Sequence, residues 1–166
     1  MTEIILNEDT KQFREAILKI GGAQRLMLCY QCGTCTNDCP VARRIKEFRP
    51  RNIARLAMYG QKQQLFSSDL LWLCAGCYTC YERCPQQVHV SEIISALRRL
   101  AVLEGKIHPT IKAQLTALPR YGYIMEIGEF ENELREEENL PPAPETDISE
   151  IALIMKKTGI LKKVGG

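Results

Sequence analysis

Apolar residues recur at helical spacing in short segments that are separated by glycine or proline. Over residues 10–20, Phe13, Ile17 and Ile20 lie three or four positions apart, which places them on one face of an α-helix. Two glycines follow at once, and glycine is favoured just beyond the end of a helix. The pattern therefore predicts an N-terminal helix over residues 10–20.

Two further helices are predicted in residues 40–60, each with a proline at its first position. Pro40 and Pro50 suit that position because the first turn of a helix needs no N–H from its first residue. The apolar stripes are Val41, Ile45 and Phe48 after the first proline, and Ile53, Leu56 and Ala57 after the second. Gly60 is expected to end the second of these helices.

Serine residues mark the expected starts of the next two helices, because a serine side chain can accept a hydrogen bond from the first turn. Ser67 or Ser68 is the candidate cap of a segment that leads into Cys74. Ser91 is the candidate cap of a longer helix, which Gly105 would end. The apolar stripe of that longer helix is Ile93, Ile94, Leu97, Leu100 and Ala101.

The periodicity weakens after Pro109. A short helix from there to Leu118 is predicted, followed by an acidic helix over residues 126–138. Residues 141–144 read Pro-Pro-Ala-Pro, which is typical of a stiff, extended linker. The C-terminal part is thus expected to hold short elements rather than a second large core.

The last apolar positions, Ile151, Ile154 and Met155, predict one small C-terminal helix. A helix this short is not stable alone, so it is expected to pack on the body of the protein or on a partner. Sustained alternation of apolar and polar residues is missing from the sequence, which predicts an all-α fold. Residues 1–108 would form the main domain, and residues 109–166 a helical or extended tail.

Charge is divided unevenly along the chain. Residues 1–125 hold 17 Lys and Arg against 10 Asp and Glu, whereas residues 126–166 hold 5 against 10. A basic body therefore carries an acidic tail. Six cations gather in residues 43–55, and they are Arg43, Arg44, Lys46, Arg49, Arg51 and Arg55. This stretch is either a solvated helix face or a docking surface for an acidic partner. Nucleic-acid binding is disfavoured because no aromatic platform or binding motif accompanies it.

All eight cysteines fall in two runs of identical form, C-x2-C-x2-C-x3-C-P. Adding 45 to a position in the first run gives its counterpart in the second. The first run is Cys29, Cys32, Cys35 and Cys39, and the second is Cys74, Cys77, Cys80 and Cys84. The match extends to the flanking pairs Leu28 and Leu73, and Thr34 and Thr79. The repeat indicates internal duplication of one binding site.

Four thiolates at tetrahedral corners are what a cubane iron–sulfur cluster requires. Three cysteines spaced two residues apart let one loop reach three corners, and in chains with two such runs the fourth cysteine ligates the other cluster. Two [4Fe–4S] clusters are therefore predicted. The first would be held by Cys29, Cys32, Cys35 and Cys84, and the second by Cys74, Cys77, Cys80 and Cys39.

Two alternative uses of these cysteines fit less well. Structural zinc prefers pairs of the form C-x2-C separated by a longer loop. Disulfides are rare in the cytoplasm, which is the expected location because the N-terminus lacks a secretory signal. No run approaches the roughly 20 apolar residues that a membrane-spanning helix needs, so direct membrane insertion is not expected.

The residues within and beside the two runs narrow the family. The segments CYQCGTCTNDCPV at 29–41 and WLCAGCYTCYERCP at 72–85 resemble the C subunit of heterodisulfide reductase. Thirty-four residues separate Cys39 from Cys74 and read as helices, unlike the short strand-forming insert of small bacterial ferredoxins. The resemblance implies the α-helical ferredoxin fold, which the iron–sulfur subunit of succinate dehydrogenase shares.

The resemblance also implies a role and partners. Electrons would enter from a flavin-bearing iron–sulfur subunit, cross the two clusters, and leave to a CCG-motif catalytic subunit that reduces the heterodisulfide of coenzyme M and coenzyme B. The chain would then be one subunit of a hetero-oligomer. It has no CCG motif, no Gly-x-Gly-x-x-Gly and no ninth cysteine, so no catalytic residue of its own is expected.

Two other functions stay open from the sequence. The second hypothesis is the iron–sulfur subunit of another flavoprotein dehydrogenase, since such subunits share both runs, although they are often fused to longer domains. The third, in a different class, is a metal-stapled interaction module without redox turnover. Iron content and reducible clusters separate the third hypothesis from both electron-transfer functions.

Overall fold

The computed structural model describes residues 3–160 and 162, and every regular element in that part of the chain is helical. The predicted all-α fold is therefore confirmed for the described residues. The chain divides into two compact units, with the boundary between Lys106 and Ile107. None of the described helices is long and apolar enough to cross a membrane.

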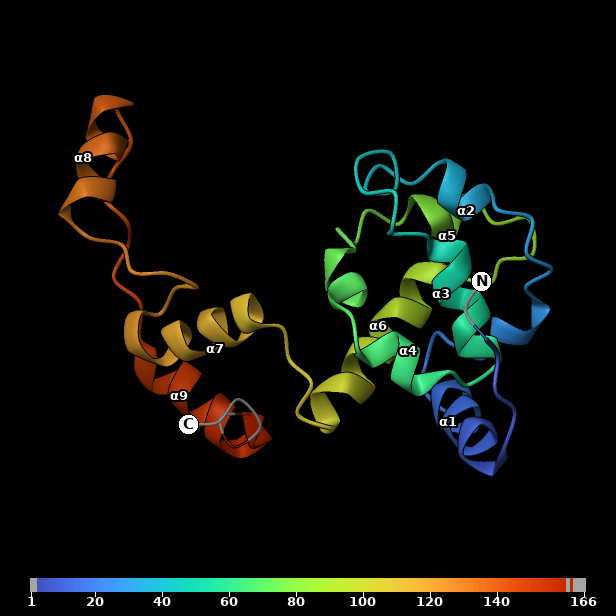
Figure 1. Ribbon diagram of the computed structural model, residues 1–166. Helices are drawn as coiled ribbons and strands as arrows, with labels where there is room; N and C mark the ends of the chain where they lie inside the picture. The colour runs from blue at the N-terminus through green and yellow to red at the C-terminus, as the bar shows by residue number, and fades with distance from the viewer. Residues whose placement is uncertain (1–2, 161, 163–166) are drawn as a thin grey trace. The chain divides into compact units, whose positions relative to one another are not determined.

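The first unit carries both cysteine runs (Figure 1). Its α-helices are α1 Glu8–Leu18, α2 Thr34–Asn37, α3 Pro50–Met58, α4 Lys62–Phe66, α5 Thr79–Glu82 and α6 Val90–Leu103. Two 3-10 segments, η1 Leu26–Leu28 and η2 Asp69–Leu73, lead directly into the first cysteine of each run. Each run is thus entered through a tight turn and left toward a longer helix.

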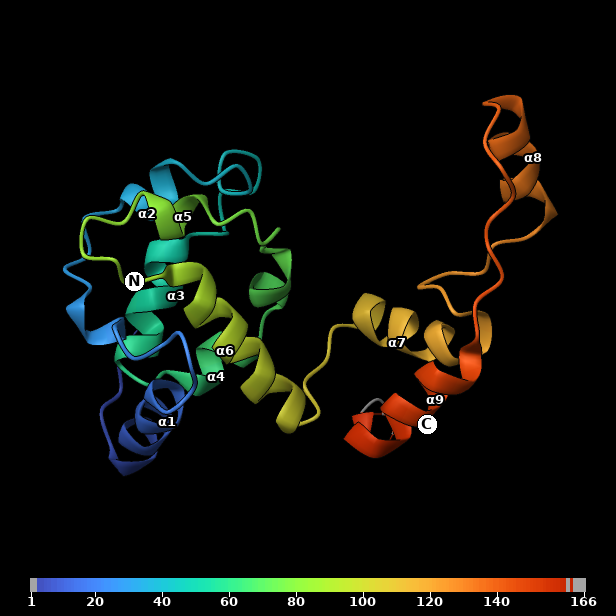
Figure 2. The ribbon, with the colours of Figure 1, turned by 180° about the vertical axis from the view of Figure 1, so that it is seen from behind.

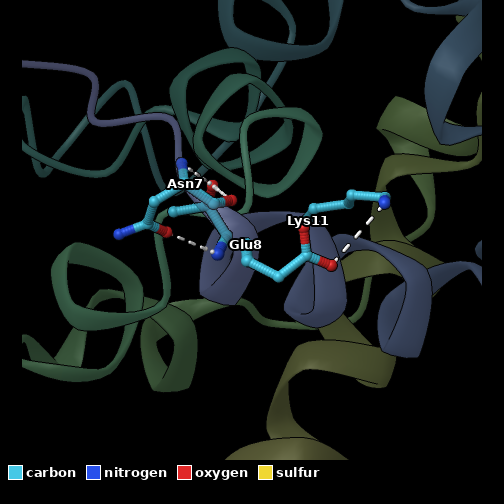
Figure 3. Close-up of polar contacts among 4 residues, drawn as sticks. Asn7, Glu8 and Lys11 are labelled. Atoms are coloured by element: carbon cyan, nitrogen blue, oxygen red, sulfur yellow. Dashed lines mark hydrogen bonds and ion pairs between the residues drawn. The ribbon is translucent and has the colours of Figure 1, made fainter.

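Helix α1 confirms the predicted N-terminal helix but begins two residues earlier. The side chain of Asn7 accepts a hydrogen bond from the Thr10 N–H (2.9 Å), and Thr10 Oγ1 accepts one from the Asn7 N–H (3.0 Å). Lys11 Nζ lies 3.6 Å from Glu8 Oε1 on the same surface (Figure 3). This reciprocal capping, which the apolar stripe does not show, sets the start of the helix.

The core of the first unit lies between α1, α3 and α6, which pack on one another in pairs. The α3 stripe of Ile53, Leu56 and Ala57 is buried, and Gly60 follows with φ +65°, as predicted. A Cβ at Gly60 would overlap the Thr10 carbonyl, so glycine here permits α1 and the end of α3 to meet. The predicted apolar stripe of α6 is also buried or half-buried, and Gly105 follows the end of that helix.

The helix predicted to start at Pro40 is wrong, because residues 40–44 form turns only. The N–H of Arg43 reaches the Cys39 carbonyl, but the N–H of Arg44 turns to Val41, three residues back, which interrupts the helical series. Phe48 is nevertheless fully buried. The apolar stripe therefore predicted burial correctly and helical structure incorrectly.

The predicted serine caps are also wrong in part. Helix α6 begins at Val90 with His89 as its N-cap in the left-handed region, and Ser91 lies inside the first turn. Ser68 does occupy the N-cap position of η2, but its side chain makes no capping hydrogen bond. The short helix α4, just before it, was not predicted.

The second unit contains α7 Pro109–Tyr121, α8 Glu129–Glu137 and α9 Ile148–Thr158. Helix α7 continues three residues beyond the predicted end, through Pro119, and α8 confirms the acidic helix. Helix α9 packs on α7, whereas we expected a contact with the body or a partner. Hydrogen bonds from Arg135 Nε to Pro141 O (2.8 Å) and from Ala143 N to Asn132 Oδ1 (2.9 Å) fix the proline-rich segment beside α8.

Candidate iron–sulfur centres

The first loop (residues 29–39) and the second loop (residues 74–84) repeat in structure as they do in sequence. One-turn helices α2 and α5 begin one residue before the third cysteine of each loop, at positions that differ by 45. The two helices lie side by side in both views (Figure 2), and they pack together. Cys35 and Cys80, the third cysteines, are 8% and 9% exposed. The duplicated loops therefore meet at their buried thiols.

Left-handed backbone occurs at two matched positions in each loop. Gln31 and Gly76 share a φ of 64°, and Gly33 and Tyr78 have φ of 92° and 59°. Such values cost a residue with a Cβ about 1–2 kcal/mol. Each loop therefore places one glycine and one other residue at the strained positions, in opposite order.

One cavity brings the fourth cysteine of the first loop to the second loop. Cys39 lines it together with Cys74, Cys77 and Cys80. Val41, Phe48, Pro50, Ala75 and Ile94 give the cavity apolar walls, and Tyr78, Thr79 and Ser91 line it as well. The end of the first loop therefore places Cys39 beside the second run, in a mainly apolar cavity.

The fourth cysteine of the second loop lies near the first loop. The Tyr30 hydroxyl bonds to Cys32, which raises the pKa of Tyr30, and the charges of Cys84 and Cys29 act in the same direction. Arg25, which precedes η1, donates from Nη2 to the Gln86 carbonyl at 3.3 Å. The chain that follows Cys84 therefore lies beside the entrance of the first loop.

Exposed and buried thiols differ in acidity, and the difference repeats. The Thr34 hydroxyl, 3.4 Å from Cys32 Sγ, lowers the pKa of that thiol, and Thr79 does the same for Cys77 at 3.4 Å. Burial raises the pKa of Cys35 to about 12 and of Cys80 to about 11. The pKa of each outer thiol is thus lower than that of its inner neighbour, and a bound cation would stabilise the thiolates of the inner pair.

Backbone N–H groups point at the fourth cysteine of each loop, Cys39 and Cys84, which would be the crossing cysteines if each ligated the cluster of the other loop. The N–H of Ala42 donates to Cys39 Sγ (3.5 Å), and the N–H of Val88 donates to Cys84 Sγ (3.3 Å). Hydrogen bonds of this kind stabilise a thiolate and its cluster. The two crossing thiols therefore receive similar support from the chain that follows them.

Three residues near the loops were not predicted from the sequence to act at the thiols. Gln31 Nε2 donates to Cys29 Sγ (3.2 Å). Ser91 is buried beside Cys80, and its N–H and hydroxyl counteract part of the rise that burial causes in the pKa of the Cys80 thiol. The hydroxyl oxygen itself makes no hydrogen bond of normal geometry. Only Gln31 carried a signal, since it stands inside a cysteine run.

Arg98 is the third residue of this kind. Its Nε donates to Leu71 O and its Nη2 to Cys74 O, both at 2.8 Å, while the guanidinium lies 5.7 Å from the Trp72 ring centre. Arg98 on α6 thereby holds the entrance of the second loop. His89 stacks on Tyr81 with ring centres 3.8 Å apart.

The donor set fits iron–sulfur clusters. All eight cysteines are free thiols, and thiolate is the ligand that such clusters use. No three His, Cys, Asp or Glu side chains within residues 3–160 and 162 converge to hold a single metal ion. The four thiolates of a cubane bind four different irons, so they need not converge on one point.

Comparison with known proteins identifies the family. A model of the 4Fe–4S dicluster domain matches residues 25–88, which span both loops. The C subunit of H(2):CoB-CoM heterodisulfide,ferredoxin reductase from Methanothermobacter thermautotrophicus is 35% identical, over 93% of this chain and 86% of that protein. An iron–sulfur C subunit of CoB–CoM heterodisulfide reductase from Methanocaldococcus jannaschii is 33% identical, over 95% and 90%.

A third relative comes from another genus of methanogens. The C subunit of ferredoxin:CoB-CoM heterodisulfide reductase from Methanosarcina mazei is 38% identical, over 78% of this chain and 79% of that protein. These relatives are subunits of an oxidoreductase complex, which implies a hetero-oligomer. The first two aligned regions extend well beyond the cysteine runs, into the second unit. The chain therefore belongs to the family of heterodisulfide reductase C subunits and is an iron–sulfur electron-transfer protein.

Proposed function

We propose that the chain binds two [4Fe–4S] clusters with exchanged fourth ligands. Cys29, Cys32, Cys35 and Cys84 would hold one cluster, and Cys74, Cys77, Cys80 and Cys39 the other. The cavity that Cys39 lines with the three other thiols of its set is the observation that carries this assignment. The hydrogen bond from Arg25 to the Gln86 carbonyl, which brings the chain after Cys84 beside the entrance of the first loop, supports the reciprocal set.

The chain's own residues would hold, shield and tune the clusters. When bound, the clusters supply one-electron oxidation and reduction at iron. The apolar wall of Phe48, Pro50 and Ile94 lies against the two buried thiols of the second set, Cys39 and Cys80, and would limit access of water to them. Backbone N–H groups of Ala42 and Val88 stabilise the crossing thiolates. Because each cluster would join both loops, binding of iron would also join the two halves of the first unit.

Within the family, we propose that this subunit relays electrons between two partners. A flavin-bearing iron–sulfur subunit would supply them, and a CCG-motif subunit would use them to reduce the CoM–S–S–CoB heterodisulfide. The names of the relatives, which include CoB–CoM heterodisulfide, support this substrate. All eight cysteines would be used as ligands, so substrate chemistry would take place in the partner. The complex would work in the cytoplasm.

Anaerobic purification tests the cluster assignment. We expect about eight irons per chain and broad absorbance near about 400 nm that bleaches with dithionite. A colourless protein with two zinc ions would contradict it and would favour the metal-stapled module. Single substitutions at the crossing cysteines, described in the Discussion, test the exchange itself.

Co-purification tests the place in a complex. Recovery of the chain with a flavoprotein and a CCG-motif protein, together with reduction of the heterodisulfide by the assembled complex, is the expected result. A stable complex with a flavoprotein dehydrogenase and no CCG-motif protein would overturn the relay to a heterodisulfide-reducing subunit, while leaving electron transfer intact.

A further inference from the structure

A basic hollow lies directly beside the first loop. Lys46, Arg49, Arg51 and Arg55 line it, together with Gln31, and its volume is about 710 Å³. One carboxylate, that of Glu47, lines it as well, so four cations face one anion. A second hollow, which Arg43 lines, shares Lys46 and Arg49 with the first and extends the positive surface.

Two cations of this basic hollow, Arg49 and Arg55, are oriented by neutral groups. Arg55 donates from Nε and Nη2 to Asn52 Oδ1 (3.2 and 3.0 Å), and Arg49 Nε donates to the Lys46 carbonyl (2.9 Å). These bonds orient the guanidinium groups without neutralising them. The positive charge is therefore available to a ligand or partner.

Gln31 connects the basic hollow to the first set of thiols. Its side chain lines the hollow, and its amide donates to Cys29 Sγ at 3.2 Å. A protein seated in the hollow would thus contact a residue that is one hydrogen bond from a proposed cluster ligand. Nothing comparable exists at the matched position of the second loop, where Gly76 has no side chain.

We propose that the basic hollow docks a carboxylate-rich surface of a redox partner, and that electrons cross at the Cys29–Gln31 contact. This inference rests on the proposed function. In the step, the cluster at the first loop loses one electron and the partner's redox centre gains it, with no bond or proton transferred. Opposite charges would speed association and fix the register of the two proteins, and salt would weaken both effects.

The lining favours an acidic protein over a nucleic acid. Single-stranded nucleic acids are bound by cations together with aromatic rings on which the bases stack. The residues that line the hollow are cationic, amide or carboxylate side chains, without an aromatic ring. A flat, carboxylate-bearing protein surface matches them better than bases do.

Charge reversal in the cluster-loaded full chain tests the proposal. Arg49→Glu with Arg51→Glu reverses two exposed cations of the hollow. Both lie at the start of α3, where added carboxylates favour the helix, so folding should not suffer. The matched control is Lys19→Glu with Arg99→Glu, which reverses two exposed cations that do not line the hollow.

Two probes are used at low salt. A labelled peptide of about ten glutamates reports binding by fluorescence anisotropy, and an acidic flavodoxin reports the rate of electron transfer from the dithionite-reduced chain by stopped flow. We expect the hollow variant to lose at least about tenfold in peptide affinity and in electron-transfer rate. The control variant should lose less than about twofold in each. Equal losses in the two variants, or no loss in either, would overturn the proposal.

Competitors identify any other occupant. Full displacement of the peptide by millimolar inorganic phosphate, without change in the flavodoxin rate, would make the hollow a small-anion site and overturn the proposal. Tighter binding of a single-stranded oligonucleotide than of the peptide would overturn it too. Bleaching of the clusters by dithionite is measured on every variant, so that failure of the docking surface is distinguished from failure of the proposed clusters.

Discussion

The two loops have the same left-handed backbone positions but put glycine at opposite ones. In the first loop the strained position between the first two cysteines is Gln31, and its counterpart in the second loop is Gly76. Two residues further on, glycine stands in the first loop at Gly33 and a tyrosine in the second, Tyr78. The location of the glycine therefore decides which of the two left-handed positions in each loop carries a side chain.

The displayed side chains give the two proposed clusters different surroundings. Gln31 and Tyr30 bond to thiols of the first loop, whereas the matched residues Ala75 and Gly76 offer no donor. Hydrogen bonds to cluster sulfurs raise the reduction potential. The first-loop cluster is thus expected to have the higher potential, so electrons would move from the second loop to the first and leave beside the basic hollow.

The largest expected effect comes from removing a crossing cysteine. Cys39→Ala should remove the cluster of the second loop and halve the iron from about eight to about four per chain. The cause is that Cys39 shares a cavity with the second-loop thiols. Iron analysis and electron paramagnetic resonance measure the loss.

Cys84→Ala is the matched variant and should remove the cluster of the first loop instead. The surviving cluster is identified by adding Gln31→Gly, which should shift its potential in the Cys39→Ala background only. A shift in the Cys84→Ala background alone would show that the fourth cysteines are not exchanged.

The next largest effect is expected from removing the Gln31 amide, a hydrogen-bond donor whose matched position in the second loop is a glycine. Gln31→Gly should lower the potential of the first-loop cluster by roughly 60 mV, which for one electron corresponds to about 1.4 kcal/mol and lies at the upper end of the range for a typical hydrogen bond. The fold should be unharmed, because glycine accepts the φ of 64° without strain. A redox titration followed by electron paramagnetic resonance measures the shift. A change in the second-loop cluster of equal size would contradict it.

The reciprocal change, Gly76→Gln, should also narrow the difference in reduction potential between the two clusters, but by less than Gln31→Gly does. Gly76→Gln introduces a donor where a Cβ meets no atom within 4 Å, but a left-handed φ of 64° costs about 1–2 kcal/mol for a residue other than glycine. The second-loop potential should rise and the melting temperature should fall. Gly76→Ala, which has the same strain and no donor, should lower the melting temperature only. A rise in the potential of the second-loop cluster in Gly76→Ala would show that the backbone, and not the added donor, causes the effect.

The smallest effect should be the same at both loops. Thr34→Val and Thr79→Val each remove a hydroxyl 3.4 Å from an outer, exposed thiol, where water can replace the lost hydrogen bond. Each should lower the potential of its own cluster slightly and by a similar amount. The difference between the clusters should therefore persist in the double variant. An unequal response would show that the threonines, and not Gln31, distinguish the loops.

Local signals in the sequence predicted most of the first unit. Helix α3 begins at Pro50 and is followed by Gly60, because these residues act through their own backbone wherever they stand. The segment 40–48 was predicted as a helix because its apolar spacing suits one. In the structure a series of turns, and not a helix, places those side chains in the core. The spacing of the apolar residues alone does not distinguish a helix from such turns.

The cysteine spacing also indicated which thiols would be near one another, although not what surrounds them. Ser91 was assigned to a cap on residue type, but the cap is His89 in a left-handed conformation that no propensity favours. Arg98 gave no signal either, since its partners are two carbonyls more than twenty residues away along the chain. Such contacts depend on the packing of α6 against η2, which is a tertiary property.

The nearness of Cys84 to the first loop has a consequence for biosynthesis. Cys39 and Cys84 are 45 positions apart, so at about 5–20 residues per second the ribosome needs roughly 2–9 s to pass from one to the other. During that interval the first loop would have emerged with three of its proposed ligands and without the fourth. Delivery of iron and sulfide would therefore have to follow synthesis of the second loop, and a chain truncated between the two would expose reactive thiols with no complete site to receive a cluster.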